Sequence, residues 1–430
     1  MPATEAIRPL LLNSEDLRGG AARAAYRLHE ALRAIGVDAR MLVQVKHGDA
    51  QSVLGPESVP ARVAGMLRPI ADLAPLLAYR ARRKTTFYPG WLPDSVARRV
   101  RRLAPDLLHL HWITGGFLKV SSLRRLQRPL VWTLHDMWAF TGGCHYDEEC
   151  GRYATGCGRC PALGSRSAYD LSYWGWSRKA RAYAGLPLHI VTPSRWLAEA
   201  ARASPLLSGH PVRVIPNAID TRVFRPIGKT AARDLLGLPQ DRRLVLFGAL
   251  FATSEPRKGY RYLEPALAQL ARLAAQLPAA PLSAVVFGAT QPAQPPQFGM
   301  PAHFLGTLSD DVSLAALYSA ADVFIAPSIQ ENLSNTVLEA LACGTPVVSF
   351  DIGGMPDMIE HRRNGYLARP FEADDLAQGL HWVLESPDRH AALGARARAK
   401  ILEEFEAEKI ARRHVELYRE VLDTAPGRQT

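Results

Sequence analysis

The chain has 430 residues, which is too long for one ordinary hydrophobic core and predicts two domains. Its 47% hydrophobic and 22% charged residues are typical of soluble globular proteins. No stretch approaches the roughly 18 consecutive apolar residues of a spanning helix. The start, MPATEAIRPLLLNSED, lacks a basic segment followed by a long apolar core, so we expect no secretory signal and a cytoplasmic location.

The positive charge is concentrated in the first half. Residues 1–217 carry 30 Lys and Arg against 16 Asp and Glu, whereas the remainder carries 22 against 25. The excess lies in RARRK (80–84), RRVRR (98–102) and SRKAR (177–181). Such a field favours a polyanion or an anionic membrane face at the cytoplasmic side, and an Arg-rich solvated surface is the alternative. Nucleic acid is not expected, because no nucleic-acid-binding signature accompanies the charge.

The sequence of the first half predicts five strands, with a helix between the first two. The expected strands are 8–13, 38–45, 106–112, 129–136 and 186–194, with a helix over 21–36. Residues 50–105 show no steady period. Within them MLRPIADLAPLLAY (66–79) is amphipathic and suits either a membrane surface or packing against the rest of the chain.

The second half shows the alternation more clearly. The expected strands are 244–250, 283–289, 303–306, 322–328 and 346–351, and the expected helices are 258–276, 310–321, 335–343 and 354–361. Strands that alternate with helices indicate an α/β fold with a parallel, doubly wound sheet in each half. We therefore expect domains at 1–217 and 218–404, and an amphipathic helix within 405–430 that packs back on the first domain.

Two glutamates stand in the stretch ENLSNTVLE. Glu331 comes shortly after the strand DVFIAPS, at the sheet edge where open α/β folds bind ligands. Asn332, Ser334 or Asn335 can cap the helix that follows, and its free amides favour a phosphate. Eight helical residues would place Glu339 about 12 Å from Glu331, which suits two ends of one ligand better than an acid–base pair. Two solvent-facing glutamates are the alternative.

A pair of cations follows the first strand of the second half. In GALFATSEPRKGY (248–260), Arg257 and Lys258 come after a strand and a glycine. The segment matches neither dinucleotide fingerprint nor P-loop, but it can present two cations to a diphosphate.

The first half offers its own candidates at strand ends. Gly19 and Gly20 stand at a strand-to-helix turn, where missing side chains admit a ligand. His111 ends one strand, and His135 with Asp136 ends the next, so all are expected at the carboxyl edge. His109 shares a strand face with His111 and is the weaker candidate.

Four of the five cysteines cluster in an insert at residues 144–160. A cytosolic chain with a C-x-x-C and two further cysteines favours a structural Zn²⁺ site, with disulfides or free thiols as alternatives. The candidate ligands are Cys144, Cys150, Cys157 and Cys160, and His145 is able to replace one of them.

The chain resembles the retaining nucleotide-sugar glycosyltransferases of the GT-B fold, in the glycosyl transferases group 1 (family 4) class. The specific matches are E-x₇-E, the following EALACGTPVVSFDIGGMPDMI, NGYL, PSRW and IPNAID. HDMWAFTGGCH is similar to the subset that builds bacterial exopolysaccharides, including colanic-acid-type enzymes. The resemblance implies two Rossmann-like domains facing a cleft and transfer from a UDP- or GDP-sugar to a glycan or a polyprenyl-diphosphate-linked acceptor.

The resemblance also implies roles for individual residues. Glu331 would contact the donor sugar, Glu339 the ribose and Lys258 the diphosphate, with His111 near the reacting sugar. Gly19, Gly20, Arg257 and the loop residues Asn332, Leu333, Ser334 and Asn335 would border the donor, while His135 and Asp136 belong to the acceptor side. The family places an Arg directly after the strand glycine, whereas Ala249 follows Gly248 here, and Arg257 would compensate.

The chemistry expected from this resemblance needs no cofactor. No D-x-D motif appears in a strand-loop context, so a metal-independent transfer is expected. Two other functions stay open at this point. One is a nucleotide-sugar epimerase that needs no acceptor, and the other is a Zn-dependent binding scaffold in which Glu331 and Lys258 are dispensable.

Overall fold

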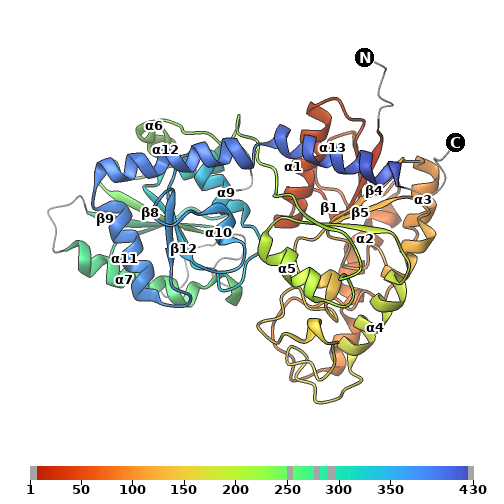
Figure 1. The fold of residues 1–430 in the computed structure, drawn as a ribbon. Helices are drawn as coiled ribbons and strands as arrows, with labels where there is room; N and C mark the ends of the chain where they lie inside the picture. The colour runs from red at the N-terminus through yellow and green to blue at the C-terminus, as the bar shows by residue number, and fades with distance from the viewer. Residues whose placement is uncertain (1–6, 249–254, 276–280, 289–295, 309, 425–430) are drawn as a thin grey trace. The chain divides into compact units, whose positions relative to one another are not determined.

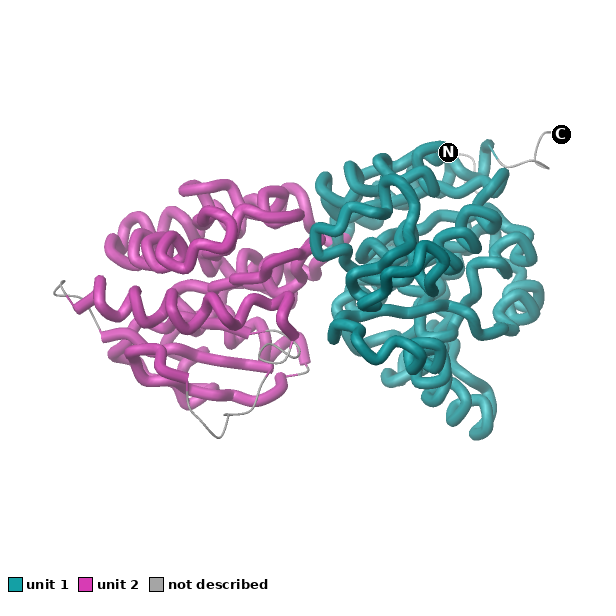
Figure 2. Tube along the Cα trace, turned by 90° about the horizontal axis from the view of Figure 1, so that it is seen from below, with its two compact units in different colours: residues 1–218, 408–430 teal, residues 219–407 magenta. Residues whose placement is uncertain are grey.

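The structure is a computed structural model that describes residues 7–248, 255–275, 281–288, 296–308 and 310–424 (Figure 1). The chain divides into two compact units (Figure 2). Unit 1 comprises residues 1–218 and 408–430, and unit 2 comprises residues 219–407. The boundaries expected from the sequence, after residues 217 and 404, lie close to these.

Unit 1 is built on a seven-stranded parallel sheet, as its apolar runs predict. The two outermost strands are short and were not among the expected ones. The order across the sheet is β3 (Val53–Leu54), β2 (Arg40–Val45), β1 (Pro9–Glu15), β4 (Leu107–Leu110), β5 (Leu130–Thr133), β6 (Leu188–Thr192) and β7 (Val212–Val214).

The helices of unit 1 begin at polar caps in several cases. Ser194 accepts a hydrogen bond from the backbone N–H of Leu197, and Asp170 accepts from those of Ser172 and Tyr173. The described α-helices of this unit are α1 (Gly20–Ala34), α2 (Val59–Asp72), α3 (Val96–Leu103), α4 (Leu171–Tyr183), α5 (Arg195–Ala203) and α13 (Ala407–Asp423), which enters the unit after its first residue. Short 3₁₀ turns are η1 (Ala74–Ala78), η2 (Val120–Arg125), η3 (Trp138–Phe140) and η4 (Arg152–Ala154).

Unit 2 holds a six-stranded parallel sheet. Its order is β10 (Ala302–Phe304), β9 (Leu282–Phe287), β8 (Arg243–Gly248), β11 (Val323–Ala326), β12 (Val347–Phe350) and β13 (Gly365–Ala368). Strands β8 and β11 are neighbours although 74 residues of chain separate their ends, so the loops after them leave the sheet side by side. The two parallel α/β sheets confirm the fold class expected from the sequence.

One of the four helices expected in unit 2 is much shorter in the structure, and three further α-helices among the described residues were not expected. The helix expected over 354–361 is reduced to α10, because Ile359 is extended and Arg362 has a φ of 62° before β13 begins. The helices are α6 (Lys229–Leu236), η5 (Pro256–Lys258), α7 (Tyr260–Ala274), α8 (Asp311–Ala320), α9 (Asn335–Ala342), α10 (Met355–Met358), α11 (Ala373–Leu384) and α12 (Pro387–Glu404). In the part of the chain that is described, no helix is both long enough and apolar enough to cross a membrane.

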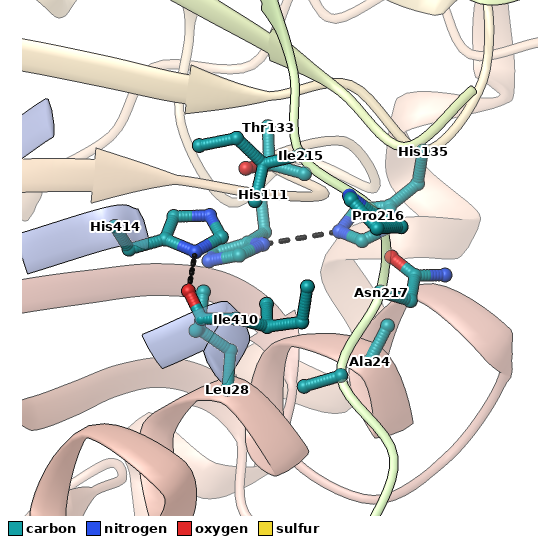
Figure 3. Close-up of a pocket in the computed structure, with 11 residues that line it drawn as sticks. Ala24, Leu28, His111, Thr133, His135, Ile215, Pro216, Asn217, Ile410 and His414 are labelled. Carbon is teal, nitrogen blue, oxygen red and sulfur yellow. Dashed lines mark hydrogen bonds between the residues drawn. The ribbon is translucent and has the colours of Figure 1, made fainter. Parts of the chain in front are cut away.

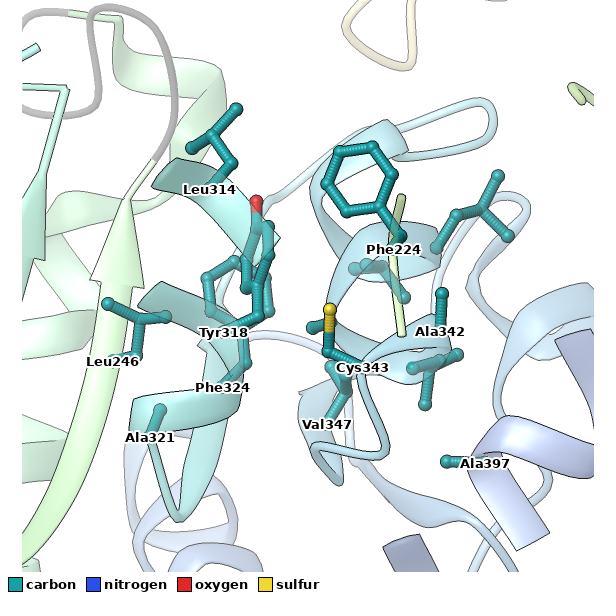
Figure 4. Packing of buried hydrophobic residues seen from close by; sticks show 14 of the residues in the cluster. Phe224, Leu246, Leu314, Tyr318, Ala321, Phe324, Ala342, Cys343, Val347 and Ala397 are labelled. Atoms are coloured by element: carbon teal, nitrogen blue, oxygen red, sulfur yellow. The ribbon is translucent and has the colours of Figure 1, made fainter. Parts of the chain in front are cut away.

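One of the buried hydrophobic clusters of unit 2 lies between its sheet and helices α8 and α9. Tyr318 packs edge-on against Phe324, with ring centroids 5.7 Å apart, beside Leu246 and Leu314 (Figure 4). Val337 and Leu338 of α9 are fully buried in the same cluster. This packing holds the start of α9 rigidly at the carboxyl edge of the sheet.

Candidate functional site

Three charged side chains meet at the carboxyl edge of unit 2. Glu331 accepts hydrogen bonds at one carboxylate oxygen, Oε2, from Arg257 at 2.9 Å and from Lys258 Nζ at 2.6 Å. Arg257 also donates to the Gln330 carbonyl at 2.9 Å and to Glu255 at 3.2 Å. The cations come from η5 after β8, and Glu331 comes from the loop after β11, so the neighbouring strands bring the cations and the acid together.

Two glycines set the positions of these loops. Gly259, at φ 71°, follows Lys258, and a Cβ there would stand 1.7 Å from the Pro327 carbonyl oxygen. Gly353, at φ 53°, lies under Glu331, and a Cβ there would stand 2.0 Å from the Glu331 carbonyl oxygen. The backbone N–H of Gly354 donates to that same oxygen. Both positions need glycine for space and for conformation.

The charges of this cluster act strongly on one another because it is buried. Burial alone would raise the pKa of the Glu331 carboxyl, but Arg257 and Lys258 outweigh it and lower that pKa to about 2. Burial lowers the pKa of Lys258, although Glu331 beside it acts in the opposite direction. Glu331 is 7% exposed and Glu339 2%, so the alternative of two solvent-facing glutamates is wrong.

The start of α9 lacks a hydrogen bond to the side chain of its N-cap residue. Ser334 occupies the N-cap position but makes no capping hydrogen bond, and its hydroxyl pairs with that of Thr336 at 2.9 Å. Asn335 is the first helical residue rather than a cap. Glu339 lies on the second turn, where its carboxylate accepts a hydrogen bond from the Tyr318 hydroxyl at 2.9 Å. Glu331 therefore lies before the helix and Glu339 inside it, as the sequence predicts.

A second cluster occupies the carboxyl edge of unit 1. His111 follows β4, His135 follows β5, and their ring nitrogens Nδ1 and Nε2 are 3.0 Å apart (Figure 3). With His414 they line a small pocket that also includes Thr133, Pro216 and Asn217. Burial lowers the pKa of His135 to about 4 and that of His111 well below its usual range, so both rings are neutral near pH 7.

His109 belongs to the framework of this cluster. It is fully buried, and its ring nitrogens lie 2.7 Å from the hydroxyls of Tyr418 and Thr133. The lower ranking of His109 as a site residue thus agrees with its place in the structure.

The turn before α1 is open. Gly19 has a φ of 91°, and a Cβ built there would meet nothing within 4 Å. Gly20 is the first residue of the helix, whose N-cap carries no side-chain hydrogen bond. The left-handed conformation explains Gly19, and the open space beside it leaves room for a ligand.

Comparison with known proteins identifies the family. Residues 18–223 match Glycosyltransferase Family 4, and residues 241–386 match Glycosyl transferases group 1. The D-inositol 3-phosphate glycosyltransferase of Thermobispora bispora is 30% identical over 333 residues, which cover 74% of this chain and 71% of that protein. The chain belongs to the group 1, family 4 glycosyltransferases.

Solved structures support the fold of this glycosyltransferase. Sucrose-phosphate synthase from Thermosynechococcus elongatus is 20% identical with a TM-score of 0.68, over 97% of this chain and 100% of that one. Anabaena HepE, solved with UDP-glucose, is 19% identical with a TM-score of 0.61, over 96% and 100%. These matches confirm the GT-B fold. They do not distinguish the exopolysaccharide enzymes from other members of the family.

One interaction in unit 1 of this glycosyltransferase was missed from the sequence. Asp136 Oδ2 lies 2.6 Å from His145 Nδ1 and accepts a hydrogen bond from Trp112 Nε1 at 2.9 Å. Burial would raise the pKa of Asp136, but His145 and the N–H donors around it lower it. A partner of His145 is thus the Asp136 carboxylate. The sequence signal for this contact is the short spacing between the two residues in HDMWAFTGGCH.

The cysteine insert lies in the same unit, and its four thiols are free. Burial raises the pKa of Cys157 to about 12 and that of Cys144 well above its usual range. The N–H groups of Ala162 and Leu163 act in the other direction on Cys160. Within the described ranges, no three or more His, Cys, Asp or Glu side chains are placed to hold a metal ion. The thiols therefore do not form a tetrahedral set here, and the zinc site stays a prediction.

Proposed function

We propose that the protein is a retaining glycosyltransferase that uses a UDP- or GDP-sugar donor. The observation that carries the proposal is the buried contact of Glu331 with Arg257 and Lys258 beside the uncapped start of α9. Cations and a helix start without an N-cap side-chain bond at one sheet edge suit a diphosphate, and a carboxylate beside them suits sugar hydroxyls.

The transfer would use these groups as the donor breaks. The bond between the anomeric carbon and the diphosphate oxygen cleaves, and the acceptor oxygen bonds to the same face of that carbon. The acceptor proton passes to the leaving diphosphate. Lys258 and Arg257 would stabilise the charge that develops on the leaving phosphates, and the rigid site avoids reorganisation at that moment.

The other residues would hold the two ends of the donor. Glu331 would accept hydrogen bonds from the sugar, and Glu339, anchored by Tyr318, from the ribose. The loop Asn332–Asn335 and the open turn at Gly19 and Gly20 would border the phosphates. Neutral His111 would act near the reacting sugar, and His135 with Asp136 on the acceptor side.

We place the acceptor among glycans and polyprenyl-diphosphate-linked oligosaccharides of cell-surface polysaccharide synthesis, at the cytoplasmic side. The HDMWAFTGGCH stretch supports this choice through its similarity to exopolysaccharide enzymes. The Thermobispora bispora relative is named for D-inositol 3-phosphate, so a small sugar-phosphate acceptor is the second candidate.

The test is a panel of UDP- and GDP-sugars assayed for release of nucleoside diphosphate. Each donor is combined with a lipid-linked oligosaccharide extract, with inositol phosphate, or with no acceptor. We expect release with one donor that depends on the lipid-linked fraction. Release with inositol phosphate alone would select the second acceptor, and release that needs no acceptor would favour epimerase-like chemistry. No acceptor-dependent release with any donor would contradict the proposal.

Two matched variants connect the activity to the site. Lys258→Ala removes a cation bound to Glu331, and Lys400→Ala removes one of similar burial that pairs with Glu360 and Glu404 elsewhere in unit 2. We expect kcat to fall about 100-fold or more in the first variant, which is the usual effect of losing one stabilising donor. Lys400→Ala should keep its activity.

A further inference from the structure

Helix α2 carries its apolar side chains outward. Its large exposed residues are Val59 (68% exposed), Val63 (45%), Met66 (55%), Leu67 (56%) and Ile70 (69%). Steps of four, three and four residues from Val59 to Ile70 place them along one face of the helix. A helix at the surface of a protein normally turns such a stripe inward.

The opposite face shows that this orientation is built into the fold. Asp72 accepts hydrogen bonds from the backbone N–H groups of Gly90 and Trp91, both at 3.1 Å. Arg68 donates to the Gly116 carbonyl at 2.7 Å. Gly65 lies so close to the Gln44 carbonyl that a Cβ there would stand 2.7 Å from it. Polar contacts hold the inner face, so the apolar stripe has to face outward.

The surface continues beyond the helix with the groups of a membrane interface. Leu77 of η1 is 83% exposed, and the exposed cations Arg80, Arg82 and Lys84 follow it. Tyr79, between them, accepts a hydrogen bond from the Leu171 N–H at 2.8 Å.

That bond brings a second segment of the chain to the end of η1. Tyr169 and Trp174 lie on either side of Leu171 and are both largely exposed. The bond therefore brings these aromatic residues to the end of η1, near Leu77 and the cations that follow it, and the apolar stripe of α2 precedes them in the chain. We call this set the α2 surface: Val59, Val63, Met66, Leu67, Ile70, Leu77, Arg80, Arg82, Lys84, Tyr169 and Trp174.

We propose that the α2 surface docks the chain on an anionic lipid bilayer. Helix α2 would lie parallel to the membrane, with its stripe among the acyl chains and Arg80, Arg82 and Lys84 at the lipid phosphates. A bilayer fits better than a second copy of the chain. A symmetric pair of α2 surfaces would bring the same cations together, whereas anionic headgroups complement them. This inference goes beyond the proposed function, and its test does not depend on transferase activity.

The experiment is flotation of the purified full chain with vesicles of phosphatidylcholine alone or mixed with phosphatidylglycerol. We expect flotation with the anionic vesicles and little with the neutral ones. The double variant Val63→Glu/Ile70→Glu should bind about tenfold more weakly or worse, because two carboxylates would enter the apolar layer. Leu235→Glu is the matched control, since Leu235 on α6 is 71% exposed, and this variant should float as the natural chain does.

The cations provide an independent arm. Each of Arg80→Gln, Arg82→Gln and Lys84→Gln should weaken binding to anionic vesicles about fivefold, and added salt should do the same to the natural chain. Thermal unfolding of every variant checks that it is folded. The proposal is overturned if the natural chain does not float, or if Leu235→Glu loses as much binding as the double variant. It is also overturned if the stripe variants dissociate a dimer in sedimentation while no vesicle binds.

Discussion

Glu331 is the residue on which the charge balance of the cluster at the carboxyl edge of unit 2 depends. Glu331 accepts hydrogen bonds from both Arg257 and Lys258, and under the proposed function a diphosphate would compete with it for the same two cations. The carboxylate thus keeps both cations in place while no donor is bound. Its burial makes this role energetically large, because an unpaired charge in such a place is costly.

Replacing Glu331 by Gln should destabilise the protein measurably. We expect the free energy of unfolding to fall by about 2–3 kcal/mol, because two partly buried cations lose their counter-charge. The pKa of Glu331 is lowered in the folded state, so its contribution is complete above its ordinary pKa of about 4.5 and is lost as pH falls towards about 2. The difference between the natural chain and the variant, measured by urea denaturation, should therefore be constant near neutral pH and shrink below about pH 4.5.

A surface ion pair supplies the control for this prediction. Glu360 pairs with Lys400 at 3.1 Å and is 38% exposed. Glu360→Gln should cost less than about 1 kcal/mol, since exposed pairs contribute little. An equal loss in the two variants would mean that burial of Glu331 does not matter.

At the scale of elements, α13 is attached to the sheet of unit 1 through histidines. His109 of β4 bonds to Tyr418 of α13, and the pocket beside them holds His111, His135 and His414 (Figure 3). Burial lowers the pKa of each of these four histidines, to about 4 for His135 and His414. The docking of α13 therefore requires neutral imidazoles.

Acidification should weaken unit 1 before it affects the ion pairs. The unfolded chain protonates its histidines below about pH 6.5 while the folded chain does not, so the free energy of unfolding should fall between about pH 6.5 and 4. Each such histidine contributes a slope of about 1.4 kcal/mol per pH unit. His414→Gln should reduce the slope by that amount in urea titrations, whereas His361→Gln, at an exposed position, should leave it unchanged. Equal slopes in all three proteins would contradict this account.

The cysteine insert has little regular structure and only a small apolar core to stabilise it. Residues 144–160 contain one short 3₁₀ turn, and a small cluster around Phe87, Leu163 and Cys160 forms their apolar core. Bound Zn²⁺ would supply the stability that so small a core lacks, after the four sulfurs draw together. We expect about one zinc per chain in protein purified under reducing conditions, and its loss on Cys157→Ser. A metal content near zero would remove the zinc site, and thiol titration would then separate disulfides from free thiols.

At the scale of the whole molecule, unit 2 is one continuous stretch of the chain, and its two ends are hydrogen-bonded to each other. The Ile219 N–H donates to the Phe405 carbonyl at 3.1 Å, and the Ala407 N–H donates to the Ile219 carbonyl at 3.0 Å. Two buried hydrophobic clusters on the faces of its sheet lie wholly within residues 219–407. These features are typical of a domain that folds alone.

The fragment of residues 219–407 should fold and bind nucleotide without unit 1. We expect cooperative thermal unfolding, and a rise in Tm of about 5–10 °C with UDP or GDP at about 100 times its Kd. Lys258→Ala in the same fragment should reduce the rise. A fragment that folds but whose Tm responds to neither nucleotide would contradict the placement of the donor diphosphate in unit 2.

Much of the architecture follows from local pattern. Apolar β-type runs and helical periods predict most of the strands, and they place Glu331 on a loop and Glu339 inside a helix. The sequence by itself also determined the family and the types of the charged residues at the candidate site of unit 2. Short strands such as β3 and β7 escaped prediction, and the helix expected over 354–361 proved far shorter, because a few residues carry too weak a period to outweigh their tertiary surroundings.

Only the tertiary structure decided which of these residues meet. Arg257 and Glu331 are 74 positions apart and touch because β8 pairs with β11, and no local pattern encodes strand order. The sequence also could not predict that the apolar face of α2 points outward. The buried face is fixed by hydrogen bonds of Asp72 and Arg68 to backbone groups 18 and 48 residues further along the chain. Periodicity fixes which residues share a helix face, but long-range hydrogen bonds decide which way that face points.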